Sequence, residues 1–243
     1  MKRVGSLFKR LLAALVLLVI LSQAWFLGWV LWWNHFNPGS TSFMSIRLAE
    51  IRQKDPEARL QQQWVAYPRI SHNLKAALIA AEDAKFVDHE GFDWDGIQKA
   101  IEKNQKKGKF VAGGSTISQQ LAKNLFLSPS KNLFRKGEEV VITLMLETVM
   151  EKERIFEIYL NVIEWGNGIF GAEAAARHYF GVSVAQLSPA QAAKLAAMVP
   201  NPRYYDTQRS RPCVGGVSLF SDLCHGTRDI DLEFMGRGVL ACM

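Results

Sequence analysis

The sequence predicts a mainly α-helical domain at residues 64–206, preceded by one transmembrane helix at residues 11–33. Three observations support this fold class. Residues 11–33 contain no charged side chain. From Ser71 onward, apolar residues recur at the three- and four-residue spacing that places them on one face of a helix. No run of residues alternates apolar and polar side chains for long enough to indicate a half-buried strand, so no strand is predicted.

The apolar segment at residues 11–33 has the length of a membrane span. Its 23 residues rise about 1.5 Å each in a helix, which is enough to cross a hydrocarbon core of roughly 30 Å. A cleaved signal peptide is the alternative, but its apolar part is usually about 7–15 residues long and ends in small residues. This segment is longer and ends in tryptophan. We therefore expect an uncleaved anchor.

The residues that flank this anchor predict its orientation. Basic residues precede it and tryptophans gather toward its far end, namely Lys2, Arg3, Lys9, Arg10 and Trp25, Trp29, Trp32, Trp33. Basic residues stay on the cytoplasmic side and tryptophan prefers the interface. We expect residues 1–10 in the cytoplasm and the domain on the outer, periplasmic face of the cytoplasmic (inner) membrane.

The next segments are assigned from their capping and breaking residues. Residues 34–63 begin with a turn-rich sequence and form a polar, weakly periodic linker near the membrane. Ser71 suits the N-cap of a helix, and Gly113 and Gly114 precede another. A long helical pattern then covers residues 137–164, with an interruption near 151–153.

Two further helices are predicted by their terminal residues. The segment GAEAAARHYFG ends in Gly181, which suits the left-handed position after a helix. In the last helix Ser188 is the N-cap and Pro189 occupies the first helical position. Pro200 ends that helix.

The tail at residues 207–243 differs from the domain before it. It has five glycines and no sustained helical period, and it holds Cys213, Cys224 and Cys242. Residues 1–212 contain no cysteine, which fits an exported domain that needs no disulfide. We expect the tail to be disordered or to derive from a shifted reading frame.

Charge is segregated along the chain, which has a formal net charge of +6 and an isoelectric point of about 9.3. Residues 82–95 carry six acids, residues 99–136 nine bases, and residues 138–164 seven acids. A solvated helical surface usually mixes signs, so this pattern predicts acidic groups that face basic groups across a cleft. Attraction to a membrane surface is the alternative for the lysine-rich run at 103–109. The net charge alone does not distinguish nucleic acid, an acidic membrane and a phosphorylated substrate.

The segment GGSTISQQLAKN is a candidate anion site. A helix that begins after two glycines offers free backbone N–H groups and the positive end of its dipole. Ser115 and Thr116 add hydroxyls, and Gln119 and Lys123 follow on the same face. This combination suits a phosphate or pyrophosphate, although an ordinary capped helix is the alternative. The spacing of a Walker loop is absent, as are a dinucleotide-binding glycine pattern and an Asp-x-Asp signature.

Two glutamates are candidates for catalysis. Glu82 follows an apolar run, and a partly sheltered carboxylate has a raised pKa that suits a general base. Glu157 is surrounded by large apolar residues, so it is either paired with a base structurally or a second catalytic carboxylate. A metal site among residues 83–95 is disfavoured because the spacing fits neither zinc nor an EF-hand. Within that range we expect His89, Asp93 and Asp95 to shape a turn.

These segments resemble, in order and spacing, the peptidoglycan glycosyltransferases. That family comprises the transglycosylase domain of class A penicillin-binding proteins and a monofunctional enzyme. Five motifs carry the resemblance: EDAKF from Glu82 with His89 and Gly91, GGSTISQQLAKN from Gly113 to Asn124, Arg135 and Lys136 with Glu139, KERIFEIYLN with Glu157, Tyr159 and Asn161, and GAEAAARHYFG at 171–181. One anchor without room for a transpeptidase domain matches the monofunctional form.

The resemblance implies a lysozyme-like fold and the polymerisation of glycan chains from lipid II. The donor is the growing glycan on its polyprenyl pyrophosphate, and Glu82 is the general base in an inverting transfer that forms β-1,4 bonds. Glu157 is the second catalytic residue, which orients the site or holds a divalent cation, Mg²⁺ by family habit. The expected substrate-binding residues are Asp83, Ser115, Thr116, Gln119, Gln120, Lys123, Asn124, Lys131, Arg135, Lys136 and Glu139.

The partners implied are lipid II, the lipid-linked glycan, the membrane and other proteins of cell-wall synthesis or division, with no nucleic acid. Two other functions remain open. A lytic transglycosylase or muramidase shares the fold and a catalytic glutamate, but it releases no pyrophosphate and has no need of the basic segment. A non-catalytic scaffold of the cell-wall machinery, inactive because of its tail, is the third class.

Overall fold

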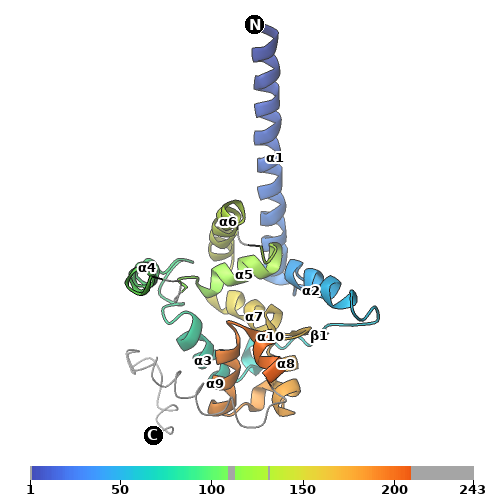
Figure 1. The fold of residues 1–243 in the computed structure, drawn as a ribbon, viewed down its shortest axis with the longest axis vertical. Helices are drawn as coiled ribbons and strands as arrows, with labels where there is room; N and C mark the ends of the chain where they lie inside the picture. Colours follow the sequence, from blue (N-terminus) through green and yellow to red (C-terminus); the bar gives the residue numbers. More distant parts are fainter. Residues whose placement is uncertain (1, 109–112, 131, 209–243) are drawn as a thin grey trace.

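The structure is a computed structural model that describes residues 2–108, 113–130 and 132–208. Its first helix, α1 (Lys2–His35), extends away from the rest of the molecule (Figure 1). The segment Lys9–His35 has a mean hydropathy of 2.3, and its most apolar window is not buried by the protein. In the described part of the chain, it is the one helix long and apolar enough to cross a membrane. It fits the predicted single-pass anchor.

The rest of the described chain is mainly α-helical, as predicted. The elements in chain order are α2 (Ser42–Arg52), β1 (Gln61–Gln62), the short 3₁₀ helix η1 (Tyr67–Arg69), α3 (His72–Glu82), α4 (Trp94–Lys107), α5 (Ile117–Phe126), α6 (Leu133–Val149), α7 (Lys152–Val162), β2 (Glu164–Gly166), β3 (Ile169–Phe170), α8 (Ala172–Phe180), the 3₁₀ helix η2 (Val184–Gln186), α9 (Pro189–Met198) and α10 (Pro202–Gln208).

The helix α7 lies at the centre of the core. It packs against α5, α6, α8 and η1, while α3 packs against α9. The buried side chains of α7 are Ile155, Phe156, Ile158, Tyr159, Leu160, Asn161 and Val162. A helix that is apolar on most of its surface is a core helix. Its neighbour α5 is therefore held in a fixed position on a packed support, and α3 is held by α9.

Three short strands form a small sheet of order β1-β3-β2, with β1 parallel and β2 antiparallel to β3. The sequence contains no alternating run that would predict these strands. Each strand has only two or three residues, too few to produce an alternating pattern in the sequence. β2 and β3 are also buried throughout, so they lack the exposed polar face on which that pattern depends.

The helix boundaries follow several of the predicted signals. The pattern at residues 137–164 is interrupted at Met150 and Glu151, whose backbones are extended. Gly181 has the left-handed conformation (φ 69°) that ends α8. Ser188 caps α9 in a reciprocal pair with Gln191. The predicted long helix therefore consists of α6 and α7, and its last residue, Glu164, belongs to β2.

The segment at residues 34–63 is a structured part of the fold. It contributes α2, which packs against α5, and β1, which pairs with β3. The predicted linker is thus integrated with the domain. The predictions for residues 209–243 and their cysteines lie outside the described residues, while residues 207 and 208 belong to α10.

Candidate active site

Glu82 is the last residue of α3 and is half-buried. The helix ends there because Asp83 adopts an extended conformation (φ −163°, ψ 75°). Glu82 Oε2 accepts a hydrogen bond of 2.8 Å from Nε2 of Gln120 on α5. Burial raises the pKa of the Glu82 carboxyl, whereas the bond from Gln120 and the charge of Lys123 oppose this rise. Such a carboxyl suits general-base chemistry near neutral pH.

Asp83 has a different environment from its neighbour. It is buried, and its Oδ2 atom accepts a 2.9 Å hydrogen bond from the backbone N–H of Ile117, the first residue of α5. Its Oδ1 atom lies 2.9 Å from Nε2 of His89. The other ring nitrogen of His89 accepts from the N–H of Gly91 at 3.1 Å, so a neutral His89 carries its proton on Nε2 and donates to Asp83. Asp83 therefore joins the end of α3 to the start of α5.

We predict that Asp83→Ala destabilises the fold. The change leaves the Ile117 N–H and the His89 Nε2–H without their acceptor, and lost hydrogen bonds to a buried charged group cost about 3 kcal/mol. Denaturant unfolding of the full chain in detergent measures this loss. Asp88→Ala, at an exposed position of the same turn, is the matched control and should change the free energy of unfolding by less than about 0.5 kcal/mol. Equal free energies of unfolding for the two variants would contradict the conclusion that Asp83 joins α3 to α5.

The start of α5 is closed by its own side chains. Thr116 Oγ1 accepts from the N–H of Gln119, and Gln119 Oε1 accepts from the N–H of Thr116. Thr116 also donates to the carbonyl of Gly91 at 2.7 Å. Both side chains are buried, whereas Ser115 is exposed. The capped-helix alternative thus accounts for Thr116 and Gln119, and Ser115 is the hydroxyl that this turn presents to solvent.

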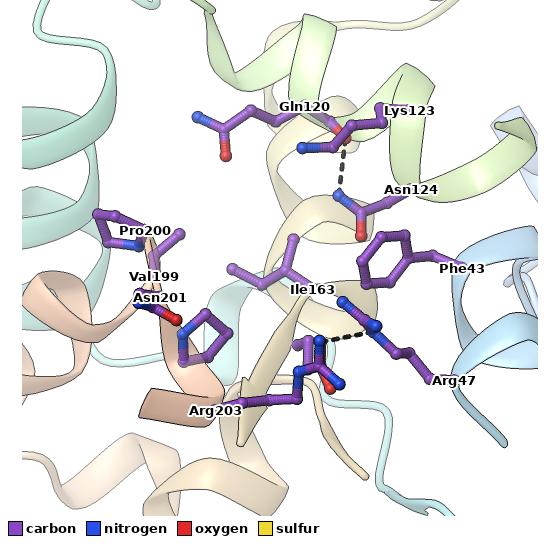
Figure 2. A pocket seen from close by; sticks show the side chains of 12 residues that line it. Phe43, Arg47, Gln120, Lys123, Asn124, Ile163, Val199, Pro200, Asn201 and Arg203 are labelled. Carbon is purple, nitrogen blue, oxygen red and sulfur yellow. Dashed lines mark hydrogen bonds and ion pairs between the residues drawn. The ribbon is translucent and has the colours of Figure 1, made fainter. Parts of the chain in front are cut away.

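A pocket opens beside Gln120, between α2, α5, β2 and the connection from α9 to α10 (Figure 2). Gln120, Lys123 and Asn124 form its α5 wall, and Asn124 donates from its amide to the Gln120 carbonyl at 2.8 Å. The other walls are lined by Phe43, Arg47, Ile163, Glu164, Val199, Pro200, Asn201, Pro202 and Arg203. The structure therefore places three of the predicted binding residues in one pocket, close to Glu82.

The sequence analysis missed the charged residues of the other walls. Arg47 Nε donates to Oε2 of the buried Glu164 at 3.1 Å, and Arg47 also pairs with Glu50. Arg203 lies 3.5 Å from the same Glu50 carboxylate. Arg47 belongs to the segment that we interpreted as a linker, and no local motif marks Arg203 or Glu164. These residues are brought together because α2 packs on α5 and α10 packs on β2.

Lys123 is the cation of this pocket that has no hydrogen-bond or ion-pair partner within the described residues. Its side chain points into the pocket beside Gln120 (Figure 2). Burial lowers the pKa of the Lys123 amine, Glu139 opposes this, and Arg135 and Lys136 add to the lowering. A half-buried ammonium without a partner is costly. The pocket is therefore suited to an anionic ligand.

Arg135, Lys136 and Glu139 form a cluster on the first two turns of α6. Glu139 is buried and accepts from Nη1 of Arg135 at 2.7 Å and from Nζ of Lys136. Arg135 Nε is buried and has no partner among the described residues. Glu139 thus positions two basic side chains within electrostatic reach of Lys123. Lys131, also predicted here, lies outside the described residues.

Glu157 is held by protein groups on both carboxylate oxygens. Oε1 accepts from the Tyr67 N–H at 3.3 Å, and Oε2 from Nη1 of Arg154 at 3.0 Å. The structural pairing with a base that the sequence left open is therefore present. No group of three or more metal-ligating side chains occurs in the parts of the chain that the structure describes. These residues do not fit a divalent cation at Glu157, and the predicted cofactor stays a prediction.

Tyr159 is a site residue that the prediction quoted in a motif without assigning it a role. Its hydroxyl donates to Oε1 of Gln120 at 3.1 Å. Complete burial raises the pKa of the phenol well above its usual range, so the hydroxyl stays protonated. Tyr159 thereby fixes the Gln120 amide so that its N–H₂ group faces Glu82. The core helix α7 supports the site in this way.

Comparisons with known proteins show which family this chain is similar to. The profile of a protein family described as "Transglycosylase" matches residues 48–214. A biosynthetic peptidoglycan transglycosylase of Dechloromonas aromatica is 70% identical over 215 residues, which cover 88% of this chain and 93% of the relative. Proteins of the same description from Chromobacterium violaceum and Aromatoleum aromaticum are 66% identical over 206 residues (85% and 90%) and 62% identical over 199 residues (82% and 86%).

Proposed function

Since the chain belongs to the transglycosylase family and is a peptidoglycan glycosyltransferase of lysozyme-like, mainly α fold, we propose that it polymerises glycan strands from lipid II. The donor is a glycan on polyprenyl pyrophosphate, and lipid II is the acceptor. One observation carries the proposal: a half-buried glutamate, Glu82, lies beside a pocket whose lysine, Lys123, has no partner among the described residues. Glu82 is a base for the acceptor, and the pocket with Lys123 is a site for the leaving group.

In the proposed reaction Glu82 removes the proton from the 4-hydroxyl of the acceptor sugar. The freed oxygen attacks the anomeric carbon of the donor, and the bond from that carbon to the α-linked pyrophosphate breaks. A β-1,4 bond forms with inversion, the pyrophosphate departs with the electron pair, and the proton remains on Glu82 until water accepts it. An in-line displacement of this kind requires the attacking oxygen and the leaving pyrophosphate on opposite sides of the reacting carbon.

The basic residues stabilise the leaving group in this scheme. Lys123 contributes a charge that no carboxylate neutralises within hydrogen-bond distance among the described residues. Arg135 and Lys136, both paired with Glu139, add charge from α6. Fixed charges aimed at developing negative charge lower the barrier because they need no reorganisation during the reaction. We place Lys131 and the hydroxyl of Ser115 in the same role.

We predict that Gln120→Leu moves the acidic limb of the kcat/KM profile to higher pH. The Gln120 hydrogen bond lowers the pKa of Glu82, so its loss raises that pKa further, and the base becomes active only at higher pH. Initial polymerisation rates between about pH 4 and 9 locate the acidic limb of kcat/KM, which reports the pKa of the base in the free enzyme. Gln53→Leu, at an exposed position outside the pocket, is the matched control and should leave the limb unchanged. A limb at unchanged or lower pH in Gln120→Leu would contradict the scheme.

The membrane location is part of the proposal. The apolar helix α1 supports a single-pass anchor, and the flanking basic residues and tryptophans favour the cytoplasmic membrane with the N-terminus inside. This places the domain at the outer face, where a lipid-linked substrate is reached from the membrane surface.

The competing function is hydrolysis of existing glycan. The full chain is incubated with lipid II in one reaction and with preformed, uncross-linked glycan in another. We expect polymer from lipid II and no shortening of the preformed strands. Shortened strands without polymer would assign the site to a muramidase or lytic transglycosylase instead. No reaction in either mixture would favour a scaffold protein.

A further inference from the structure

The end of the membrane helix is held by one side chain of the catalytic core, Arg154 on α7. Its Nε and Nη2 atoms both donate to the carbonyl of Trp33, at 3.0 and 2.7 Å, and Nη2 also donates to the carbonyl of Phe36 at 2.8 Å. Nη1 donates to Oδ1 of Asn37 and to Glu157, each at 3.0 Å. A guanidinium group has five N–H donors, and here they make five hydrogen bonds.

The chemistry of this contact suits the end of a helix. The last carbonyls of a helix have no partner within it, and the carboxyl end carries a partial negative charge. α1 ends at His35, so the carbonyls of Trp33 and Phe36 belong to this end. A planar guanidinium binds two such carbonyls and a side-chain oxygen at once, which the single ammonium of lysine does less well. Arg154 is therefore a cap supplied to α1 by another helix.

A second contact joins the same part of α1 to α5. Phe126, the last residue of α5, has its ring centroid 5.2 Å from that of Phe26 and 5.0 Å from that of Trp33. Val30 and Trp33 are buried in the hydrophobic core of the domain. The end of α1 that meets the domain in Figure 1 is thus both packed against it and hydrogen-bonded to it.

The helix α6 packs along α1, and the two helices that contact the end of α1 through Phe126 and Arg154, α5 and α7, also carry the active site. Lys123 and Gln120 lie on α5, and Phe126 follows Lys123 by one turn. Tyr159, which bonds Gln120, lies on α7 five residues beyond Arg154 and two beyond Glu157. Glu157 links Arg154 onward to the N–H of Tyr67 in η1. Within the described residues, this route from α1 to Glu82 runs through side chains carried by the helices α7 and α5.

We propose that Arg154 is a positioning residue, which locks the membrane helix to α7 and so fixes the height and tilt of the Glu82 site above the membrane. This inference rests on the proposed lipid-linked substrate. The bilayer sets the depth of α1 through its apolar length and interfacial tryptophans. The rigid joint transmits that depth to Glu82, so that a substrate held in the same bilayer meets the site in a reactive position. Glu157 acts within this joint.

The experiment compares one substrate in two media. Polymerisation of lipid II is measured for the full chain and for Arg154→Ala, first in vesicles of anionic and zwitterionic phospholipid and then in detergent micelles. In vesicles we expect kcat/KM to fall on the order of 10²-fold, because a misplacement of about 1 Å has such an effect. In micelles, where no bilayer fixes the height of the substrate, we expect a fall of less than about fivefold. Arg154→Lys should lie between Arg154→Ala and the unaltered chain.

The controls separate positioning from stability. Arg52→Ala removes an exposed arginine that donates to one backbone carbonyl, that of Ala58. This variant should leave kcat/KM unchanged in vesicles and in micelles. An equal loss in vesicles and micelles, or no loss in either, would overturn the inference. A lower unfolding temperature without a difference between the media would have the same meaning.

A measurement without catalysis distinguishes this inference from the proposed function. Spin labels are placed at Leu21 on α1 and Ala190 on α9, both exposed, after the three native cysteines are replaced by serine. We expect a narrow distance distribution in vesicles for the labelled chain and a broader one when Arg154→Ala is added. Distance distributions of equal width with and without Arg154→Ala would overturn the inference that Arg154 locks α1 to α7, even if the chain polymerises lipid II. A broadened distribution in a chain that makes no polymer would retain the joint while the proposed function fails.

Discussion

Glu82→Gln is expected to lower the turnover of lipid II by roughly 10²–10⁴-fold, the contribution of a positioned general base. Glutamine keeps the size of the side chain and its contact with Gln120, but it cannot accept the proton of the acceptor hydroxyl. The measurement is the initial rate of polymer formation by the full chain at saturating lipid II. A variant that polymerises at the rate of the unaltered chain would exclude Glu82 as the base.

The same change should not weaken the fold. Burial raises the pKa of Glu82 in the folded protein above its unfolded value, so the folded state resists ionisation. The free-energy cost of holding the ionised Glu82 in the folded protein is absent below the unfolded pKa and is complete above the folded pKa. At neutral pH Glu82→Gln removes it, and we expect an unfolding temperature equal to or above that of the unaltered chain. A marked decrease would mean that the loss of turnover reflects unfolding.

Lys123→Met is expected to lower kcat/KM by roughly 10²–10³-fold, the effect of removing one preorganised group from a developing charge. Methionine fills similar space but contributes no charge to the pyrophosphate. Lys123 has no hydrogen-bond or ion-pair partner among the described residues, so its removal breaks no such contact there. Polymerisation at varied lipid II concentration measures the loss.

Two further readouts identify the cause of this loss. Removal of the charge of Lys123 raises the pKa of Glu82, so the acidic limb of the kcat/KM profile should move to higher pH. The folded pKa of Lys123 is lowered by burial, so the charged form is destabilising at neutral pH and the variant should unfold at an equal or higher temperature. Lys54→Met, at an exposed position of the membrane-proximal segment, is the control. Unchanged kinetics in Lys123→Met would contradict the anion site.

The features that the sequence predicted correctly depend on local signals. The long apolar helix near the N-terminus, the cap at Ser188 and the left-handed Gly181 each follow from adjacent residues. The raised pKa of Glu82 also follows from the apolar run before it. The capping pair of Thr116 and Gln119 shows the limit of this approach, because hydroxyl and amide groups at a helix start serve the helix or a ligand equally well.

The features that were missed depend on packing between distant segments. Arg47 reaches the pocket only because α2 packs on α5. The role of Glu157 depends on whether it faces Glu82 or Arg154, and no spacing in the sequence decides this. Arg154 itself looks like one more charge on a helix surface until the end of α1 is placed against it.

The most direct test of the account is the amount of polyprenyl pyrophosphate released for each glycosidic bond formed. The full chain is supplied with lipid II in vesicles, and both products are counted in the same reaction, alongside Glu82→Gln and Lys123→Met. The account predicts equal amounts of the two products, with both rates reduced together in each variant. Glycosidic bonds that form or break without release of polyprenyl pyrophosphate would contradict this mechanism. Release of polyprenyl pyrophosphate by Glu82→Gln at the rate of the unaltered chain would contradict it as well.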